Sequence, residues 1–328
     1  MCGRRQVMRV PASSHAFLKG MVNVTRLLDC TASEFASMSK DELLHAIAAS
    51  EGRVLASESI INLTPAVTNV SNPEICAAMG ADILLLNYFD VNAPAIEGLP
   101  PHEPAETVRL LKKLVGRPIA INLEPGDPAA PDDPTWNALL PGLMATAENA
   151  VKAADMGVDF ILITGNPGHG VSNERVIAAI RELSEAVGDR VVIAAGRMHC
   201  SGVISESSEN IISAEDVRAY AEAGADVILM PAPGTVPGIT MEFVRGMVGE
   251  IHRTGKLAMT SIGTSQEGAD TDTVRSIALM AKQAGVDIHH IGDTGFIGIA
   301  LPENIMAYSI AIRGIQHTYR RMALSVNR

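Results

Sequence analysis

The hydrophobic positions of the chain recur in short blocks, and four of these blocks follow the same phrase. The four segments read AAMGADILLLN, AADMGVDFILIT, AEAGADVILMP and AKQAGVDIHHIG. In each one, an Ala-rich helix end is followed by Gly, a small residue, Asp and then a run that is apolar on both faces. Such runs are typical of parallel strands that are covered by helices on both sides.

Four further strand candidates lie between these segments and read GRVLASE, GRPIAINLE, DRVVIAAGR and GKLAMTSIG. Together the segments predict eight strands that start near residues 53, 82, 117, 158, 190, 225, 256 and 286. Spacings of about 30 to 40 residues leave room for one crossover helix after each strand. The fold class predicted is therefore α/β, a closed (β/α)8 TIM barrel, with an open doubly wound sheet as the alternative.

Local signals mark several helix ends. An Ala-rich stretch predicts a helix from Ala138 to Met156, and a capping-box-like signal at Ser213 opens a second helix that runs to Ala223. Pro302 suits the first turn of a last helix. The recurring glycines are expected in left-handed turns at helix ends, and they are Gly80, Gly157, Gly224 and Gly285.

The recurring aspartates enter their strands at the amino end, away from the place where barrel enzymes keep their chemistry. We expect them to be structural caps or ion-pair partners. They are Asp82, Asp159, Asp226 and Asp287.

Residues 1–50 form an N-terminal extension, and residues 51–328 form the barrel as a single domain. A capping-box signal at Ser39 and Glu42 predicts a helix from Lys40 to Ala49 in this extension. Such an extension is expected to close the bottom of the barrel or to join a neighbouring subunit, so we expect a homo-oligomer.

Net charge, cysteine spacing and the lengths of the apolar runs limit the partners and the cellular location that can be expected. The formal net charge is −11, which argues against nucleic acid and anionic membranes as partners. The four cysteines form no CxxC pair, which suits a reducing compartment and gives no zinc spacing. No apolar run has the length of a signal peptide or a membrane span, so a cytoplasmic protein with no membrane partner is expected.

The chemistry of a barrel enzyme lies at the carboxyl ends of its strands. Three acidic residues, Glu58, Asp90 and Glu124, follow the first three strands and are expected to project towards one region. Carboxylate oxygens suit Mg²⁺ or Mn²⁺, and Asp90 and Glu124 are the predicted metal ligands. The alternative is that these side chains bond to loop amides or to Arg197.

Two histidines follow the fourth and fifth strands and are the candidates for acid–base catalysis. His169 stands in the Gly-rich loop ILITGNPGHGVSNERV, and His199 lies beside Arg197 and Cys200. Cys200 is expected to be an inert buried thiol. His289 and His290 lie inside the last strand, where one is expected to point inward and one outward, with packing as the preferred interpretation.

Gly-rich loops follow the last two strands, where barrels often bind phosphate through backbone N–H groups. The alternative is that these turns simply pack tightly. The predicted substrate-binding residues combine both loops with polar residues at other strand ends. They are Asn87, Asn122, Asn166, Arg197, Gly263, Thr264, Ser265, Gly292, Asp293, Thr294 and Gly295.

The lysine positions argue against two classes of enzyme, because no lysine follows the carboxyl end of a predicted strand. A Schiff-base aldolase or a PLP enzyme would need an amine there. Neither PLP nor NAD is therefore expected as a cofactor.

Three phrases, ADILLLNYFDV, IGDTGFIGIALPENIMAYSIAIRG and HTYRRMA, resemble a bacterial family labelled phosphoenolpyruvate phosphonomutase-like. The resemblance covers the chain from about residue 50 onward. It implies a barrel of the phosphoenolpyruvate mutase and isocitrate lyase type, whose members use Mg²⁺ to hold an enolate-like intermediate. The chain has neither the Lys-Cys-Gly-His motif of the lyases nor the Asp-Lys-rich loop of the mutases, and HCSG at residues 199–202 only scrambles the former. No catalytic residue is carried over from that family.

These observations predict an isomerase or lyase that acts on a small anionic metabolite bearing a phosphate, a phosphonate or a carboxylate. His169 and His199 would move protons with Glu58 nearby, and Mg²⁺ or Mn²⁺ would assist. One alternative is a metal-independent phosphosugar isomerase or epimerase. The other is a barrel that binds a metabolite without catalysis.

Overall fold

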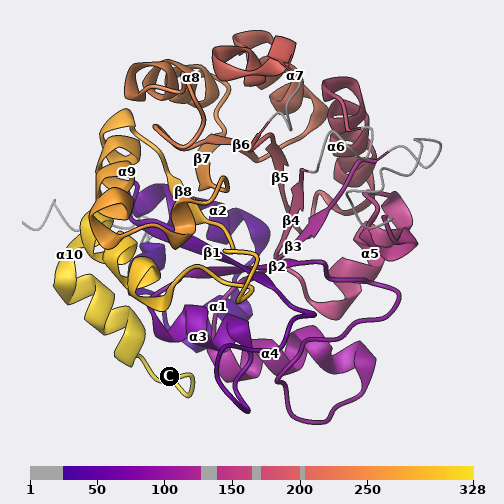
Figure 1. Cartoon of the computed structure of the whole chain (residues 1–328). Helices are drawn as coiled ribbons and strands as arrows, with labels where there is room; N and C mark the ends of the chain where they lie inside the picture. Colours follow the sequence, from indigo (N-terminus) through magenta and orange to yellow (C-terminus); the bar gives the residue numbers. More distant parts are fainter. Residues whose placement is uncertain (1–24, 127–138, 165–170, 200–203) are drawn as a thin grey trace, which may run out of the picture.

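The computed structural model describes residues 25–126, 139–164, 171–199 and 204–328. Eight parallel strands close into a barrel in the order of the sequence, with β1 pairing with both β2 and β8 (Figure 1). The closed order excludes the open sheet, and each strand starts within two residues of its predicted start. The strands are β1 Val54–Ile60, β2 Ile83–Asn87, β3 Ile119–Leu123, β4 Phe160–Ile163, β5 Val192–Gly196, β6 Val227–Pro231, β7 Leu257–Ile262 and β8 Ile288–Ile291.

One helix follows each strand and packs on the outside of the barrel (Figure 1). Ser213 forms the predicted capping box, and Pro302 stands in the first turn of the last helix, as the sequence predicts. The helices are α3 Asn72–Ala78, α4 Thr107–Val115, α5 Ala147–Met156, α6 Asn173–Val187, α7 Ala214–Ala223, α8 Met241–Arg253, α9 Thr271–Ala284 and α10 Pro302–Ala323. Among the described residues, none of these helices is both long and apolar enough to cross a bilayer.

The helix predicted from Ala138 begins later, at Ala147. Pro141 opens a short 3-10 turn, and the backbone of Glu124 then pairs with the chain on both sides of Met144. Thr146 caps the helix by accepting the N–H of Asn149 at 3.3 Å. The Ala-rich composition therefore gave a start that was too early, because pairing beside β3 holds this segment extended.

At the amino ends of the strands, the barrel lumen is filled by apolar side chains from alternate strand positions. Ala56, Leu85 and Leu162 belong to this inner cluster, whereas their neighbours Leu55, Leu84 and Ile161 pack outward against the helices. Because inward and outward positions alternate along every barrel strand, the strands are apolar on both faces.

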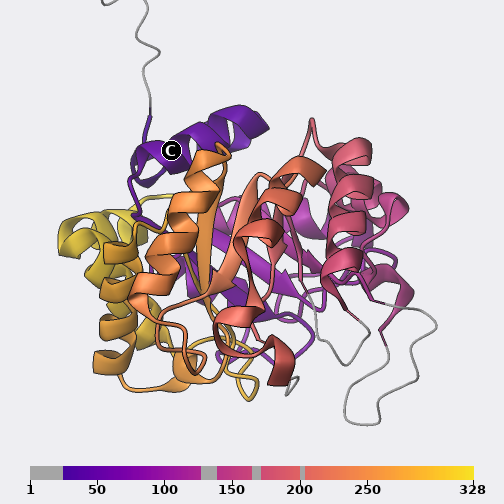
Figure 2. The ribbon, with the colours of Figure 1, turned by 90° about the horizontal axis from the view of Figure 1, so that it is seen from above.

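The described part of the N-terminal extension closes the amino end of the barrel. It consists of a 3-10 turn, η3 Leu27–Asp29, and two helices, α1 Ala32–Ser37 and α2 Lys40–Ala49. The helix predicted from Lys40 to Ala49 is thereby confirmed with its capping box. Leu27, Phe35 and Ile47 join the inner cluster, and Figure 2 shows these indigo helices lying across one end of the barrel.

The recurring Gly-x-Asp phrase has one structural role in all four places. The glycines have positive φ angles, from 94° at Gly285 to 113° at Gly224, and so let each helix turn into its strand. Each aspartate accepts the backbone N–H of the preceding strand: Asp82 from Leu55 at 2.9 Å, Asp159 from Ile119 at 2.8 Å, Asp226 from Ile193 at 2.9 Å and Asp287 from Ala258 at 2.8 Å.

The same aspartates are ion-pair partners. Their partners come from four different elements: Arg313 for Asp82, Lys112 for Asp159, Lys40 for Asp226 and His252 for Asp287. The prediction of structural caps and ion pairs is confirmed.

Candidate active site

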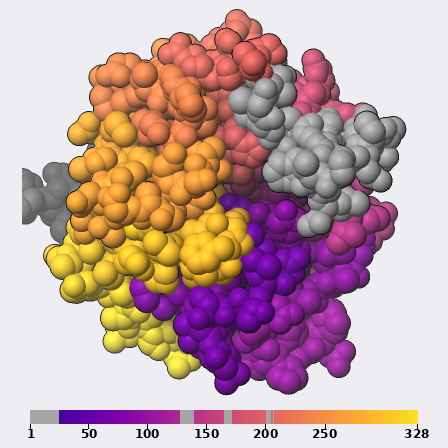
Figure 3. Space-filling model, viewed as in Figure 1, coloured from indigo at the N-terminus to yellow at the C-terminus, as the bar shows by residue number. Residues whose placement is uncertain are grey.

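The lumen becomes polar at the carboxyl ends of the strands. Each polar side chain lies two residues beyond an inward-facing apolar residue of its strand, so it faces the lumen as well. This face of the molecule is hollowed near its centre, between the orange and yellow loops after β7 and β8 and the indigo loop after β1 (Figure 3). The inward polar side chains include Glu58, Asn87, Asn122, Ser261 and His290.

Three of these side chains form a chain of contacts across neighbouring strands. His290 Nδ1 lies 2.6 Å from Ser261 Oγ, and His290 Nε2 lies 3.3 Å from Glu58 Oε2. The second contact is within ion-pair distance, but its geometry does not make a hydrogen bond, and His290 Nε2 is unsatisfied among the described residues. His290 is fully buried and Glu58 is 5% exposed. We infer that His290 positions Glu58, the member of the chain that is nearer to solvent.

Asp293 lies beside this chain, directly after β8. Burial, and next the charge of Glu58, raise the pKa of the Asp293 carboxyl from 3.8 to about 6. The backbone N–H of Gly295 donates to Asp293 Oδ1 at 2.8 Å, and the Asn87 side chain also bonds to it, which limits the rise in pKa. Part of the Asp293 population is therefore protonated near neutral pH.

Glu267 is a third carboxyl of this group, in the 3-10 turn η9 Gln266–Gly268 after β7. Burial raises the pKa of Glu267 from 4.5 to about 7, and the charges of Asp293 and Glu58 add to the rise. Its Oε1 accepts the backbone N–H of Ser265 at 3.1 Å, while its buried Oε2 has no hydrogen-bond partner in the described part of the chain. Ser265 itself has a strained φ of 84°.

Arg197 and His199 follow β5; Arg197 is buried, and His199 is partly buried. Arg197 is 4% exposed. Burial, and next the Arg197 charge, lower the pKa of His199 below 6.5, while Glu58 opposes this. The lowered pKa of His199 favours its neutral imidazole, the form that can accept a proton.

The structure describes contacts of both predicted metal ligands, Asp90 and Glu124. Asp90 Oδ1 accepts the backbone N–H of Asn92 at 2.8 Å and packs against Gly142, where an added Cβ would lie 1.7 Å from it. Asp90 thus takes the alternative role, a bond to a loop amide. The Glu124 charge acts on Tyr88, whose pKa is raised mainly by burial. No group of three or more His, Cys, Asp or Glu within the described ranges could hold a metal ion, so a metal at Asp90 and Glu124 stays a prediction.

The loops predicted to bind phosphate hold themselves together with their own donors. The hydroxyl of Thr264 donates to the carbonyl of Thr235 at 2.7 Å, and that of Thr294 donates to the carbonyl of Ile299 at 2.8 Å. The N–H groups of Ser265 and Gly295 are each taken by a protein carboxylate, and the N–H of Gly292 donates to the Ile262 carbonyl at 2.7 Å. Phosphate binding by Gly263, Thr264, Ser265, Gly292, Thr294 and Gly295 stays a prediction.

Three residues singled out in the sequence lie outside the described ranges. They are Asn166 and His169, in the Gly-rich loop after β4, and Cys200. Asn122 is described, and its buried Oδ1 has no hydrogen-bond partner among the described residues.

Sequence reasoning missed His290, Ser261 and Glu267 as site residues. The two histidines of β8 do divide as expected: His289 points outward, with its ring nitrogens 3.2 Å from Tyr308 Oη and 3.1 Å from the Gly52 carbonyl. Strand alternation could have marked His290 as inward-facing, but its contact with Glu58 depends on how β8 and β1 pair.

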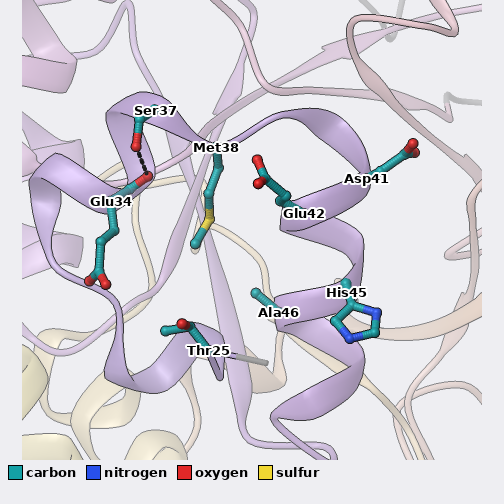
Figure 4. Close-up of a pocket in the computed structure, with 8 residues that line it drawn as sticks. All are labelled: Thr25, Glu34, Ser37, Met38, Asp41, Glu42, His45 and Ala46. Carbon is teal, nitrogen blue, oxygen red and sulfur yellow. Dashed lines mark hydrogen bonds between the residues drawn. The ribbon is translucent and has the colours of Figure 1, made fainter. Parts of the chain in front are cut away.

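A cavity of about 400 Å³ lies at the opposite end of the molecule, between α1 and α2 (Figure 4). Two of its carboxylates are already used, because Glu34 and Glu42 complete the capping boxes of these helices. The cavity lies far from the polar end of the lumen and lacks its buried acid–base groups. Its lining residues are Thr25, Glu34, Ser37, Met38, Asp41, Glu42, His45 and Ala46.

Solved structures resemble the chain at low sequence identity. An archaeal fructose 1,6-bisphosphate aldolase is 12% identical with a TM-score of 0.51, and the match covers 80% of this chain and 95% of that one. A protein described as a "putative lyase/mutase" from Burkholderia cenocepacia is 17% identical with a TM-score of 0.47, over 88% of this chain and 95% of that one. Thiamine phosphate pyrophosphorylase from Pyrococcus furiosus is 12% identical with a TM-score of 0.46, over 80% and 96%.

The likeness to the aldolase, the one of the three with a TM-score above 0.5, shows a shared fold and nothing about the reaction. No curated protein matches the sequence, and the phosphonomutase-like resemblance stays a prediction. A family model does match residues 28–328, nearly the whole chain, and the protein therefore belongs to the family described as Domain of unknown function (DUF7916).

Proposed function

We propose that this chain is an enzyme, an isomerase or lyase that moves a proton on a small metabolite carrying a carboxylate or a phosphoryl group. The observation that carries the proposal is the contact chain Ser261–His290–Glu58, flanked by the carboxyls of Asp293 and Glu267. Carboxyl groups with pKa values pushed towards neutrality by burial and by like charges are common at sites of acid–base catalysis.

Glu58 is the group that we propose as the base. Its carboxylate faces the lumen and has an imidazole 3.3 Å away, which can orient it and stabilise its charge. Asp293 and Glu267, with pKa values of about 6 and about 7, are partly protonated at neutral pH and can supply a proton to the other side of the reacting bond. His199, whose lowered pKa favours the neutral imidazole, is a second proton acceptor after β5.

Arg197 is the group that we propose for the anionic end of the substrate. A guanidinium presents a planar pair of donors that matches a carboxylate or a phosphoryl group. Asn87 on β2 and Asn122 on β3 are inward-facing polar residues at the same end of the lumen as Glu58 and can bond to substrate oxygens.

Mg²⁺ is implied by the family resemblance, and only Asp90 and Glu124 among the predicted ligands could contribute carboxylates to it. Asp90 is committed to its own loop, and no larger ligand group exists among the described residues. The proposed proton transfers use only groups of the chain. A metal-independent phosphosugar isomerase or epimerase is a second candidate, because it would use the same carboxyl acid and base.

The test is proton exchange in D2O, followed by 1H NMR on phosphonopyruvate, malate and a set of sugar phosphates. Wild-type protein should exchange a carbon-bound proton next to the carbonyl or carboxylate of at least one compound. Glu58→Gln should slow this exchange by about 100-fold or more, within the range that general base catalysis contributes. Glu185→Gln changes an exposed carboxylate on α6 and serves as the matched control. Exchange that survives in Glu58→Gln would remove Glu58 as the base.

A further inference from the structure

We propose that Ser261 is a positioning residue, which holds the ring proton of His290 on Nε2, the nitrogen that faces Glu58. A neutral imidazole carries one proton on either ring nitrogen, and the hydrogen bond made by one nitrogen decides which form is present. The catalytic consequence rests on the proposed function, because Glu58 is the proposed base. The tautomer itself is a property of the folded chain and can be observed without a substrate.

His290 has one ring nitrogen towards each of two partners on neighbouring strands. Its Nδ1 lies 2.6 Å from Ser261 Oγ on β7, and its Nε2 lies 3.3 Å from Glu58 Oε2 on β1. Ser261 stands opposite His290 in the pairing of β7 with β8, and His290 and Ser261 are at most 1% exposed. Because strand pairing sets these positions, the contact between the hydroxyl and the imidazole is built into the barrel.

Ser261 has one hydroxyl proton and two possible acceptors for it. Its Oγ lies 3.0 Å from Met198 Sδ, besides the 2.6 Å contact with His290 Nδ1. A thioether sulfur is a weak acceptor, whereas the bare nitrogen of a neutral imidazole is an ordinary acceptor of hydrogen bonds. The Ser261 proton therefore goes to Nδ1 in preference to the sulfur, and the ring proton of His290 then lies on Nε2.

The carboxylate of Glu58 favours the same tautomer. His290 Nε2 makes no hydrogen bond within the described ranges, so its main neighbour is the Glu58 oxygen at 3.3 Å. A bare nitrogen would place a lone pair against the carboxylate, whereas an N–H places a partial positive charge there, with little water to screen either effect. Once Glu58 has taken up a proton this attraction ends, and Ser261 alone then keeps the tautomer that the next turnover requires.

The first experiment reads the tautomer by 15N NMR on the full-length protein labelled at histidine. Protonated and bare ring nitrogens differ widely in chemical shift, and the His290 signals are those that disappear in His290→Gln. At pH 8 the wild-type protein should show a protonated Nε2 and a bare, hydrogen-bonded Nδ1. Glu58→Gln should keep this tautomer, because Ser261 still donates to Nδ1. A protonated Nδ1 in either protein, alone or together with Nε2, would overturn the proposal.

The second experiment uses the proton-exchange assay to test whether the tautomer matters. Ser261→Ala should slow exchange by about tenfold or more, because the imidazole beside the base is no longer held in one form. Ser261→Thr, which keeps a hydroxyl, should restore most of the rate. Thr260→Val is the matched control, since it removes the buried hydroxyl of the preceding residue, which has no partner in the described part of the chain, and it should leave the rate unchanged.

The outcomes separate this inference from the proposed function. Exchange that depends on Glu58 but proceeds equally fast in Ser261→Ala would overturn the positioning role and leave the proposed base in place. A rate in Ser261→Thr as low as in Ser261→Ala would also overturn it, because the hydroxyl would not be what matters. The expected NMR pattern without exchange in any compound would support the tautomer and count against the proposed function.

Discussion

Carboxylates gather at both ends of this barrel, but their bonding partners differ between the two ends. At the amino end, four aspartates each accept a backbone N–H of the preceding strand and each contact a basic side chain, as Asp82 does with Leu55 and Arg313. At the carboxyl end, Glu58, Asp293 and Glu267 lie near one another, and each raises the pKa of a neighbour or has its own raised. The same side-chain chemistry serves structure at one end and is available for reaction at the other.

Burial alone does not explain this difference. Burial also raises the pKa of Asp159 at the amino end, but Lys112 and the N–H of Ile119 oppose the rise. At the carboxyl end the charges of neighbouring carboxylates reinforce the effect of burial on the pKa values of Asp293 and Glu267. The comparison teaches that the partners of a buried carboxyl, more than its burial, distinguish a structural residue from a candidate for acid–base chemistry.

The largest effect should come from Asp82→Ala at the amino end. Asp82 is fully buried, and its loss leaves the guanidinium groups of Arg313 and Arg321 without their carboxylate. Removing one partner of a buried ion pair costs about 3–5 kcal/mol, so the free energy of unfolding in urea should fall by that amount. Asp272→Ala breaks an exposed pair with Arg275 and should cost less than about 1 kcal/mol. Equal losses in the two variants would contradict the structural role.

Glu58→Gln should show the reverse pattern at the carboxyl end. Activity in the proton-exchange assay should collapse, while the free energy of unfolding should stay within about 1 kcal/mol of wild type, as for substitutions that leave packing intact. Urea titrations run beside the exchange assay check this. A loss of stability comparable to that of Asp82→Ala would mean that Glu58 is a structural carboxylate as well.

Glu267→Gln should change how stability depends on pH. The pKa of Glu267 is raised in the folded state, from 4.5 to about 7, so folding favours its protonated form. The stability that this gives is fully present below pH 4.5 and is lost as the pH rises through about 7. At pH 8 the variant should therefore gain about 1–2 kcal/mol relative to wild type, less than the full shift implies because water reaches the site.

Thermal or urea unfolding of both proteins at pH 5 and pH 8 measures this difference. The groups that act on Glu267 are Asp293 and Glu58, together with the N–H of Ser265. Because Asp293 titrates close by, Asp293→Asn is the companion variant. A difference between variant and wild type that is the same at both pH values would contradict the raised pKa.

The smallest effect should come from His252→Asn, which removes the most exposed partner of the four amino-end aspartates. His252 Nε2 lies 2.8 Å from Asp287, but its side chain is 45% exposed. Asp287 keeps the N–H of Ala258, so the loss should be about 0–1 kcal/mol. If urea titrations showed the free energy of unfolding falling by more than about 2 kcal/mol, the exposed His252–Asp287 pair would be a major contributor to stability, contrary to this expectation.

The sequence by itself determined the fold and the end of the barrel where the polar residues gather. The repeated Gly-x-Asp phrase specifies four helix-to-strand turns. In each turn the glycine adopts the left-handed conformation that ends the helix, and the aspartate accepts a backbone N–H at the start of the neighbouring strand. Eight runs that are apolar on both faces, spaced for one helix each, favour a closed barrel, and the observed strand order then excludes the open sheet. Glu58, Arg197, His199 and Asp293 could be named from their places after the strands.

Only the tertiary structure decided which of those groups act on one another. His290 meets Glu58 because β8 closes the sheet against β1, a pairing between residues at opposite ends of the chain. Glu267, in the short turn after β7, is close enough to Asp293 and Glu58 for their charges to raise its pKa, whereas Asp90 accepts its own loop amide. The physical reason is that pKa values and proton-transfer contacts depend on distances of a few ångströms between elements. Periodicity along the chain specifies the elements and leaves those distances open.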